Sequence, residues 1–186
     1  VVDGREVPLF AGVFAIFGHG NVTCLSEALE QVQDSLPTWR GQNEQAMGLA
    51  ATGFAKARKR RQLMVATASI GPGALNMVTA AGTAHANRLP VLFLAGDTFT
   101  NRLPDPVLQQ VEHYGDPGTT VNDAFRAVSR YWDRISHPAQ IISSLPKAIA
   151  TLLDPADCGP AFIALPQDTQ ELAYDYPDAF FQRTVW

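Results

Sequence analysis

Short runs of apolar and β-branched residues recur along the chain, with the length and continuity typical of strands that are buried on both faces. These runs cover residues 13–17, 63–68, 91–95 and 161–165. Helical patterns lie between them, at residues 22–32, 43–58, 74–86 and 138–153. The alternation predicts an α/β fold: a doubly wound, mainly parallel sheet with helices on both faces.

Polar and glycine-rich loops mark the predicted ends of the strands. They cover residues 18–21, 40–44, 68–73 and 96–98. Because ligands of such sheets collect outside the carboxyl ends of the strands, we expect all four loops to open on one rim. A long loop with weak periodicity, called the long loop below, then runs from beyond Asp97 to about Asn122. Loops of that length are uncommon unless they are functional or cover another surface.

We expect one domain over residues 1–166 and a linker over residues 167–186 that leads toward a central domain absent from this chain. A length of 186 residues suits a single domain with its own core. The segment after Pro166 shows no clear element, and its aromatic residues need a neighbour that covers them. Since the sequence starts at Val1 without a methionine or a signal pattern, we also expect a piece of a longer protein.

Charge and composition narrow the choice of function. The net charge of −4 and the pI of about 5.5 disfavour nucleic acid as a partner, and the one basic run, at residues 56–61, lies at a predicted helix end. No apolar stretch reaches the roughly 20 residues that span a bilayer, so no membrane partner is expected. Cys24 and Cys158 lie far apart without metal-ligand spacing. We therefore expect reduced thiols, no metal site and a cytoplasmic protein.

Glu44 is the first candidate for chemistry, because it falls in the first turn of a predicted helix. One interpretation is a solvated acid that the helix dipole favours. The alternative starts from the small residues on one face of that helix: Ala46, Ala50, Gly53 and Ala57. Close packing of this face would draw Glu44 into an apolar interface, where desolvation favours the protonated carboxyl group and makes it a usable acid.

The second candidate is the turn Gly71-Pro72-Gly73, which is neither a dinucleotide fingerprint nor a Walker loop. It is explained by a tight turn before a helix, or by close approach of the backbone to a flat ring, with Ser69 and Asn76 supplying hydrogen bonds. His19, between two glycines on the same rim, is either a turn residue or a side chain suited to proton transfer near neutral pH.

Three motifs, 18–20, 43–57 and 71–76, occur in an order and spacing that resemble the pyrimidine-binding domain of thiamine-diphosphate enzymes of the acetolactate-synthase type. The resemblance extends from about residue 12 to residue 166. The amino-acid sequence of residues 14–22, 39–44 and 122–126 is similar to that of the trihydroxycyclohexane-dione hydrolases of inositol catabolism. Asn43 replaces the usual histidine before the acid, and Ser69 replaces the usual threonine, which points away from the pyruvate-using members.

The resemblance implies roles for individual residues. Glu44 would be the catalytic acid that hydrogen-bonds the aminopyrimidine ring and drives it to the imino tautomer. The cofactor-binding positions would be Gly20, Glu44, Ser69, Pro72 and Asn76. His19 and Gln109 would face the reacting end, on the side of the substrate.

The resemblance also implies an activity for the whole protein. A thiamine-diphosphate-dependent hydrolase would cleave a carbon–carbon bond in trihydroxycyclohexane-1,2-dione, a small polyhydroxy dione, and release a deoxy-glucuronic acid. Mg²⁺ would be bound by a domain absent from this chain, and the partners would be the remaining domains and further copies in a homodimer or tetramer. This chain alone would then be inactive. Two alternatives stay open: a domain of an acetolactate-synthase-type carboligase, and a noncatalytic assembly module.

Overall fold

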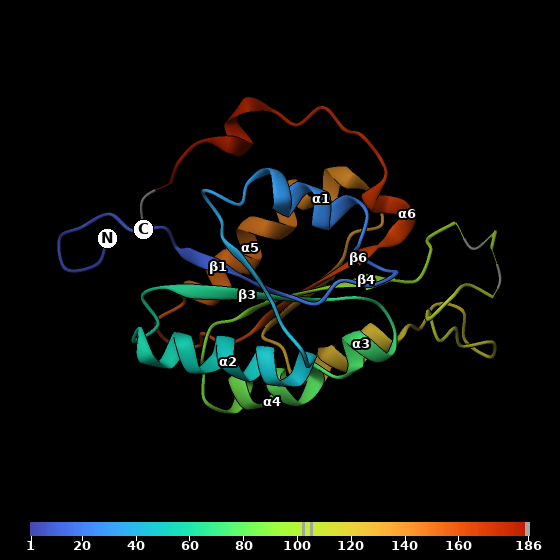
Figure 1. The fold of residues 1–186 in the computed structure, drawn as a ribbon, viewed down its shortest axis with the longest axis horizontal. Helices are drawn as coiled ribbons and strands as arrows, with labels where there is room; N and C mark the ends of the chain where they lie inside the picture. The colour runs from blue at the N-terminus through green and yellow to red at the C-terminus, as the bar shows by residue number, and fades with distance from the viewer. Residues whose placement is uncertain (102, 105, 185–186) are drawn as a thin grey trace.

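A six-stranded, all-parallel sheet forms the centre of the molecule, in the strand order β2-β1-β3-β4-β6-β5. The computed structural model describes residues 1–101, 103–104 and 106–184. The strands are β1 Phe10–Ala15, β2 Thr38–Arg40, β3 Leu63–Ala68, β4 Leu92–Asp97, β5 Tyr131–Arg134 and β6 Ala161–Pro166. Figure 1 shows the sheet edge-on between two layers of helices.

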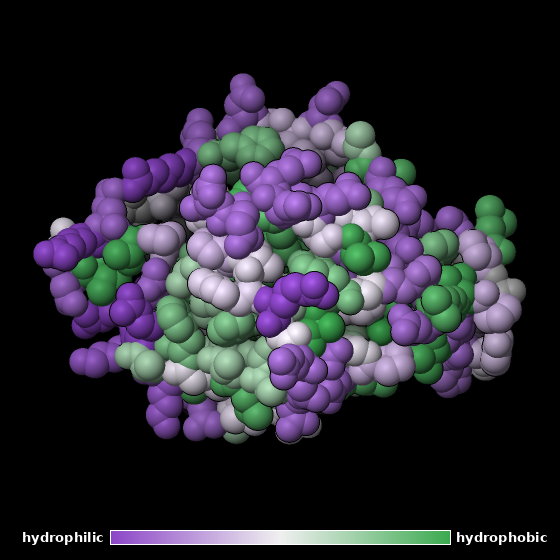
Figure 2. Space-filling view, in the orientation of Figure 1, coloured by the Kyte–Doolittle hydropathy of each residue, from purple (hydrophilic) through white to green (hydrophobic). Residues whose placement is uncertain are grey.

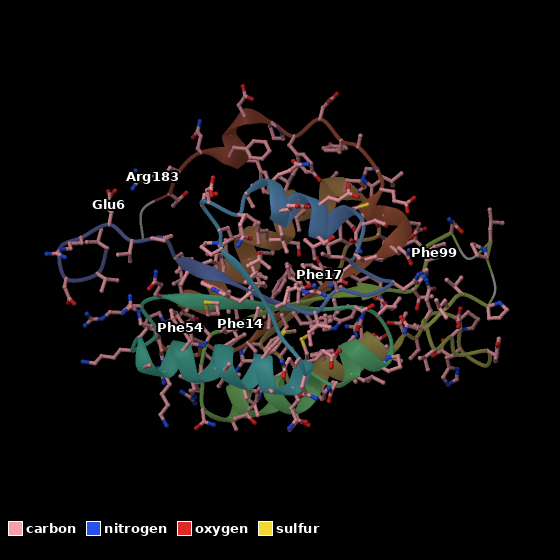
Figure 3. All side chains as sticks on the ribbon, in the orientation of Figure 1. Glu6, Phe14, Phe17, Phe54, Phe99 and Arg183 are labelled. Atoms are coloured by element: carbon pink, nitrogen blue, oxygen red, sulfur yellow. The ribbon has the colours of Figure 1, made fainter. Side chains whose placement is uncertain are left out.

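The two helical layers cover opposite faces of the sheet (Figure 1). The first layer contains α1 Cys24–Gln31 and α5 Ile141–Leu153, and the second contains α2 Glu44–Ala57, α3 Pro72–Leu75 and α4 Val78–Ala86. Each layer has its own apolar core, one around Leu63 and Leu152 and the other around Phe93 and Phe162. In Figure 3, Phe14 and Phe54 lie on the side that α2 covers. The predicted doubly wound α/β fold is confirmed.

Strand prediction succeeded where a strand is buried on both faces. All six residues of β3 are buried, and its bounds equal the predicted run. β1 begins three residues earlier than predicted, at Phe10, and ends at Ala15. β2 and β5 were not predicted, because they are short edge strands without a buried residue and so lack a continuous apolar run.

The predicted helix 74–86 is divided in the structure. Pro72, at the first helical position, starts α3 earlier than expected, and α4 begins at Val78. The backbone of Asn76 and Met77 between them stays in the right-handed helical region, with φ of −65° and −86°. The departure is therefore a local bend rather than a loop.

The expectation for the small-residue face of α2 is wrong. The buried side of the helix is formed by Met47, Gly48, Ala51, Thr52 and Ala55, while Ala46, Ala50, Gly53 and Ala57 are exposed. Close packing occurs at Gly48, where a Cβ atom would lie 2.7 Å from Cβ of Ala80, whereas a Cβ atom at Gly53 would meet nothing within 4 Å. Figure 2 shows the exposed face of α2 as a pale, weakly hydrophobic surface.

The segment after Pro166 has elements of its own, contrary to expectation. It contains α6 Gln167–Gln170 and the 3-10 helix Asp178–Phe181. Its aromatic side chains contact one another, in the pairs Tyr174–Tyr176, Tyr176–Phe180 and Phe180–Phe181. The Tyr176 hydroxyl also donates to the main-chain oxygen of Pro138. Whether residues 167–186 form a linker stays a prediction, and residues 185 and 186 lie outside the described part.

The two ends of the described chain lie on the same side of the molecule, opposite the loop that follows β4 (Figure 1). Arg183 forms an ion pair with Glu6 there (Figure 3). Within the described residues, none of the helices has both the length and the apolar character needed to cross a bilayer.

Candidate cofactor-binding site

The candidate site lies at the carboxyl edge of the sheet, where the loops after β1, β2, β3 and β4 emerge together. From β1 the chain moves outward to β2, then returns across the sheet to β3 on the other side of β1. The strand order therefore reverses between β1 and β3. In open parallel sheets, ligands bind outside the carboxyl ends of the strands at such a point.

The turns after β1 and β3 are joined directly by a buried hydrogen bond. The backbone N–H of Gly20 donates to Oγ of Ser69 over 3.1 Å. A Cβ atom at Gly20 would lie only 2.7 Å from Cβ of Ile70, so the two turns can approach this closely because residue 20 has no side chain. Asn21, which sequence reasoning did not single out, is also buried and accepts a hydrogen bond from the N–H of Gly18 over 2.9 Å.

Glu44 begins α2 at this rim. Asn43 caps the helix, since its Oδ1 accepts a hydrogen bond from the N–H of Ala46 over 2.9 Å. The cap fixes where the helix starts and places Glu44 in its first turn, as predicted. The helix dipole also stabilises the negative charge of a carboxylate at this N-terminal position.

The Glu44 carboxylate is held on one side and free on the other. Nδ2 of Asn76 donates to Oε2 of Glu44 over 2.8 Å, whereas Oε1 has no hydrogen-bond partner among the described residues. A Cβ atom at Gly73 would lie 3.3 Å from Oε1, so the absence of a side chain keeps that oxygen open. Glu44 is half-buried, so it is neither fully solvated, as the first interpretation expects, nor fully desolvated, as the second expects.

An open hollow of about 590 Å³ lies beside this carboxylate, and its lining residues are Glu44, Pro72, Gly73, Leu75 and Asn76. Pro72 and Leu75 give it apolar surface, and Glu44 and Asn76 give it hydrogen-bonding groups. A flat heteroaromatic ring needs this combination of an apolar contact and a few placed polar atoms. The chemistry of the residues present is therefore compatible with such a ring.

The predicted cofactor-binding residues fall into two groups. Glu44, Pro72 and Asn76 share the hollow, while Gly20 and Ser69 are buried behind it and support the turn. Within the described chain, the lining of the hollow includes neither Gly20 nor Ser69. All five assignments stay predictions, but the last two have the geometry of supporting residues.

The predicted substrate-side residues lie near this rim without lining the hollow. The main-chain oxygen of Gln109 sits where a Cβ atom of Gly71 would be, at 1.8 Å, and φ of Gly71 is +61°. Only glycine fits this position, so the long loop rests directly on the turn. The side chain of Gln109 is exposed, and the half-buried His19 has no hydrogen-bonding partner among the described residues. Both roles stay predictions.

A partly buried polar network lies at the far end of the long loop, and the sequence did not reveal it. Arg134 donates to Oδ2 of Asp97 over 2.6 Å and to Oδ2 of Asp123 over 2.9 Å. Burial lowers the pKa of Arg134, but Asp97 and Asp123 outweigh it and leave the pKa raised. Burial likewise raises the pKa of Asp123, yet its hydrogen bonds with Arg126, Thr120 and Arg134 bring that pKa below its usual value. The position of Asp97 at the end of a buried strand was the available signal.

Two residues of α6 were also missed, because the segment that carries them was expected to have no element. Asp168 and Gln170 hydrogen-bond to loops of this rim. Among the residues that the structure describes, no group of three His, Cys, Asp or Glu side chains has a geometry that could hold a metal ion.

Comparisons with known proteins agree with this geometry. Residues 10–125, more than half of the chain, match the family described as thiamine pyrophosphate enzyme, N-terminal TPP binding domain. The chain is 53% identical over 183 residues to the 3D-(3,5/4)-trihydroxycyclohexane-1,2-dione hydrolase of Geobacillus thermodenitrificans, a match that covers 98% of this chain and 29% of that protein. It is 51% identical to 3D-(3,5/4)-trihydroxycyclohexane-1,2-dione hydrolase 1 of Bacillus cereus, over 98% of this chain and 28% of that protein.

The chain thus spans less than a third of the length of these relatives. The family match covers β1 to β4, Glu44, the glycine turn and the whole of the long loop. The chain therefore belongs to the thiamine pyrophosphate enzymes and contains their N-terminal TPP binding domain.

Proposed function

We propose that this chain supplies the pyrimidine-binding half of a thiamine-diphosphate site in a larger enzyme that hydrolyses a carbon–carbon bond of trihydroxycyclohexane-1,2-dione to give a deoxy-glucuronic acid. One observation carries the cofactor assignment: the Glu44 carboxylate is anchored through Oε2 by Asn76 and leaves Oε1 open beside a hollow that Pro72 and Leu75 also line. The names of the relatives support the substrate, and their greater length supports the larger enzyme.

Each residue of the hollow has a distinct part in this proposal. Asn76 orients the carboxylate, Gly73 leaves space beside Oε1, and Pro72 and Leu75 would contact the ring. Glu44 would hold a nitrogen of the ring and would carry the proton that the ring gains or loses. When bound, thiamine diphosphate supplies the carbon nucleophile, which no amino-acid side chain provides.

The remaining parts of the site are proposed to lie outside this chain. Mg²⁺ and the diphosphate would be held in the part of the relatives' length that this chain does not cover. A homodimer or tetramer in the cytoplasm is proposed as the working form. Exposed large hydrophobic residues of the long loop support a covering partner: Leu103, Leu108, Val111 and Tyr114. Figure 2 shows green, hydrophobic surface at the right, where this loop lies.

The experiment compares Glu44→Gln with wild type in the full-length protein that contains this chain, supplied with thiamine diphosphate and Mg²⁺. Loss of a general acid–base group should lower turnover of the dione by about 100-fold or more. Glu30→Gln, on the exposed side of α1, is the matched control and should turn over normally. Unchanged turnover in Glu44→Gln would show that Glu44 is not the activating acid and would favour the assembly module.

The carboligase alternative is decided by the substrate. Wild-type full-length protein should turn over the cyclic dione faster than pyruvate. Faster turnover of pyruvate would overturn the hydrolase assignment and favour a carboligase, while leaving the cofactor assignment intact.

A further inference from the structure

Helix α6 contacts two loops of the candidate site at once. Nε2 of Gln170 donates to the main-chain oxygen of Gly20 over 2.8 Å and to that of Leu165 over 2.8 Å. Asp168 accepts hydrogen bonds from the N–H groups of Thr100 and Asn101, over 3.0 and 3.1 Å, and from the Thr100 hydroxyl over 2.7 Å. One short helix therefore links the Gly20 turn with the start of the long loop.

The geometry of a helix explains how two nearby residues reach different loops. Residues two positions apart on an α-helix point about 200° away from each other. Thr169, between Asp168 and Gln170, is buried and fixes the helix against the domain. Asp168 and Gln170 are thereby directed to opposite sides of the helix, and each holds a different loop.

The restraint at Asp168 extends toward the glycine turn. The Phe99 N–H, one residue before Thr100, donates to Oε1 of the buried Gln110 over 3.1 Å. The neighbouring Gln109 rests with its main-chain oxygen on Gly71. Figure 3 shows Phe99 at the start of this loop. A chain of contacts thus joins α6 to the part of the loop that lies on the candidate site.

The charge of Asp168 suits this restraint. Its carboxylate receives two backbone N–H groups and a hydroxyl, and hydrogen bonds to a charged acceptor are stronger than neutral ones. Burial raises the pKa of Asp168, but the hydrogen bonds from Thr100 and Asn101 outweigh it and leave that pKa below its usual value. The ionised form is therefore the one that holds the loop.

We propose that Asp168 and Gln170 are positioning residues with separate tasks: Asp168 sets the loop that carries Gln109, and Gln170 sets the Gly20 turn. The inference rests on the proposed function, because that function assigns the loop of Gln109 to the substrate and the turn of Gly20 to the cofactor. Neither residue lines the hollow beside Glu44, so each acts through the backbone that it holds.

The test measures two constants in the full-length protein: the Kd for thiamine diphosphate, with Mg²⁺ present, and the KM for the dione. Asp168→Asn should raise KM about tenfold and leave Kd within about twofold, because the amide cannot accept all three hydrogen bonds as a carboxylate does. Gln170→Met, which keeps the length of the side chain but removes the donor, should raise Kd about fivefold and leave KM within about twofold. Asp175→Asn and Gln182→Met, at exposed positions, are the matched controls.

Amide hydrogen exchange provides a second readout that needs no cofactor. In Asp168→Asn, the amides of Thr100 and Asn101 should exchange about tenfold faster than in wild type. Thr100→Ser, which keeps the hydroxyl, should retain the wild-type KM, and Thr100→Val should raise it.

Three outcomes would overturn the inference: unchanged exchange at Thr100 and Asn101 in Asp168→Asn, both constants unchanged in the two α6 variants, or both constants rising together in proportion to a lower melting temperature. Failure of the proposed function is distinguishable, because wild-type protein would then bind no thiamine diphosphate or would turn over pyruvate faster than the dione. The exchange rates would still decide whether Asp168 holds the loop.

Discussion

Asn76 donates a hydrogen bond to the Glu44 carboxylate over 2.8 Å, across 32 positions of sequence and between the helices of two successive strand-to-helix connections. The bond leaves one carboxylate oxygen open. It therefore determines which oxygen of Glu44 faces a ligand in the hollow.

Replacing Asn76 by alanine should impair function more than stability. The carboxylate loses its restraint, and since hydrogen bonds to charged groups contribute about 1.5–3 kcal/mol, turnover of the full-length protein should fall about tenfold or more. The melting temperature should fall less than that figure implies, because Glu44 and Asn76 are both half-buried and water can replace the lost partner in the unliganded protein. Steady-state kinetics and thermal denaturation together check this. Asn87→Ala, which removes an exposed amide at the end of α4, is the control, and equal activity of the two variants would contradict the assigned role.

Gly48→Ala should destabilise the chain by roughly 1–3 kcal/mol, because the added Cβ atom would lie 2.7 Å from Cβ of Ala80 and force α2 away from α4. Gly53→Ala, on the same helix, is the matched control. Its Cβ atom would enter open space, so it should stabilise the helix by about 0.5–1 kcal/mol. Urea unfolding of both variants measures the difference. The same sign for both changes would show that the buried and exposed faces of α2 are assigned wrongly.

Removing Arg134 should strongly destabilise the protein. In Arg134→Met the fully buried carboxylate of Asp97 loses its charged partner, and removal of one partner of a buried pair costs about 3–5 kcal/mol. The second change Asp97→Asn removes the unpaired charge and should recover part of that loss. A double-mutant cycle by chemical denaturation measures the coupling. Additive effects of the two changes would mean that the ion pair contributes no coupling.

Stability should fall as acid protonates Asp123. Its pKa is lower in the folded protein than in the unfolded chain, where it is about 3.9. Between these two pKa values the unfolded chain binds more protons than the folded protein, so the unfolding free energy rises with pH in that window. The stabilising contribution of Asp123 is therefore lost as the pH falls through its folded pKa. Asp123→Asn should show a shallower loss below about pH 4. Denaturation at a series of pH values tests this, and the exposed Asp34→Asn should behave like wild type.

The sequence predicted the parts of the fold whose burial is complete. The run at β3 has six buried residues, the continuous pattern that indicates a strand buried on both faces. β5 has four half-buried residues, and its place beside β6 depends on pairing across 30 positions, from Tyr131 to Ala161. Edge strands of this kind can be identified only from their pairing in the folded sheet.

The candidate site likewise has features that the sequence predicts and features that it does not. Glu44 and the turn at Gly71 stand at element boundaries, where residue type and position along the chain are enough to suggest their roles. The restraint on Glu44 by Asn76 and the rim contacts of Asp168 depend on distances between separate elements. The exposed small face of α2 shows the limit of helical periodicity, which identifies a face but not the side on which the sheet lies.

Both ends of the described chain lie on the side away from the loop that follows β4, where Glu6 and Arg183 form an exposed ion pair. A fluorophore, an affinity tag or a surface-attachment handle placed at either end would therefore extend away from the hollow beside Glu44. Sensors of ligand binding can be mounted on this domain without obstructing the face that they are meant to observe.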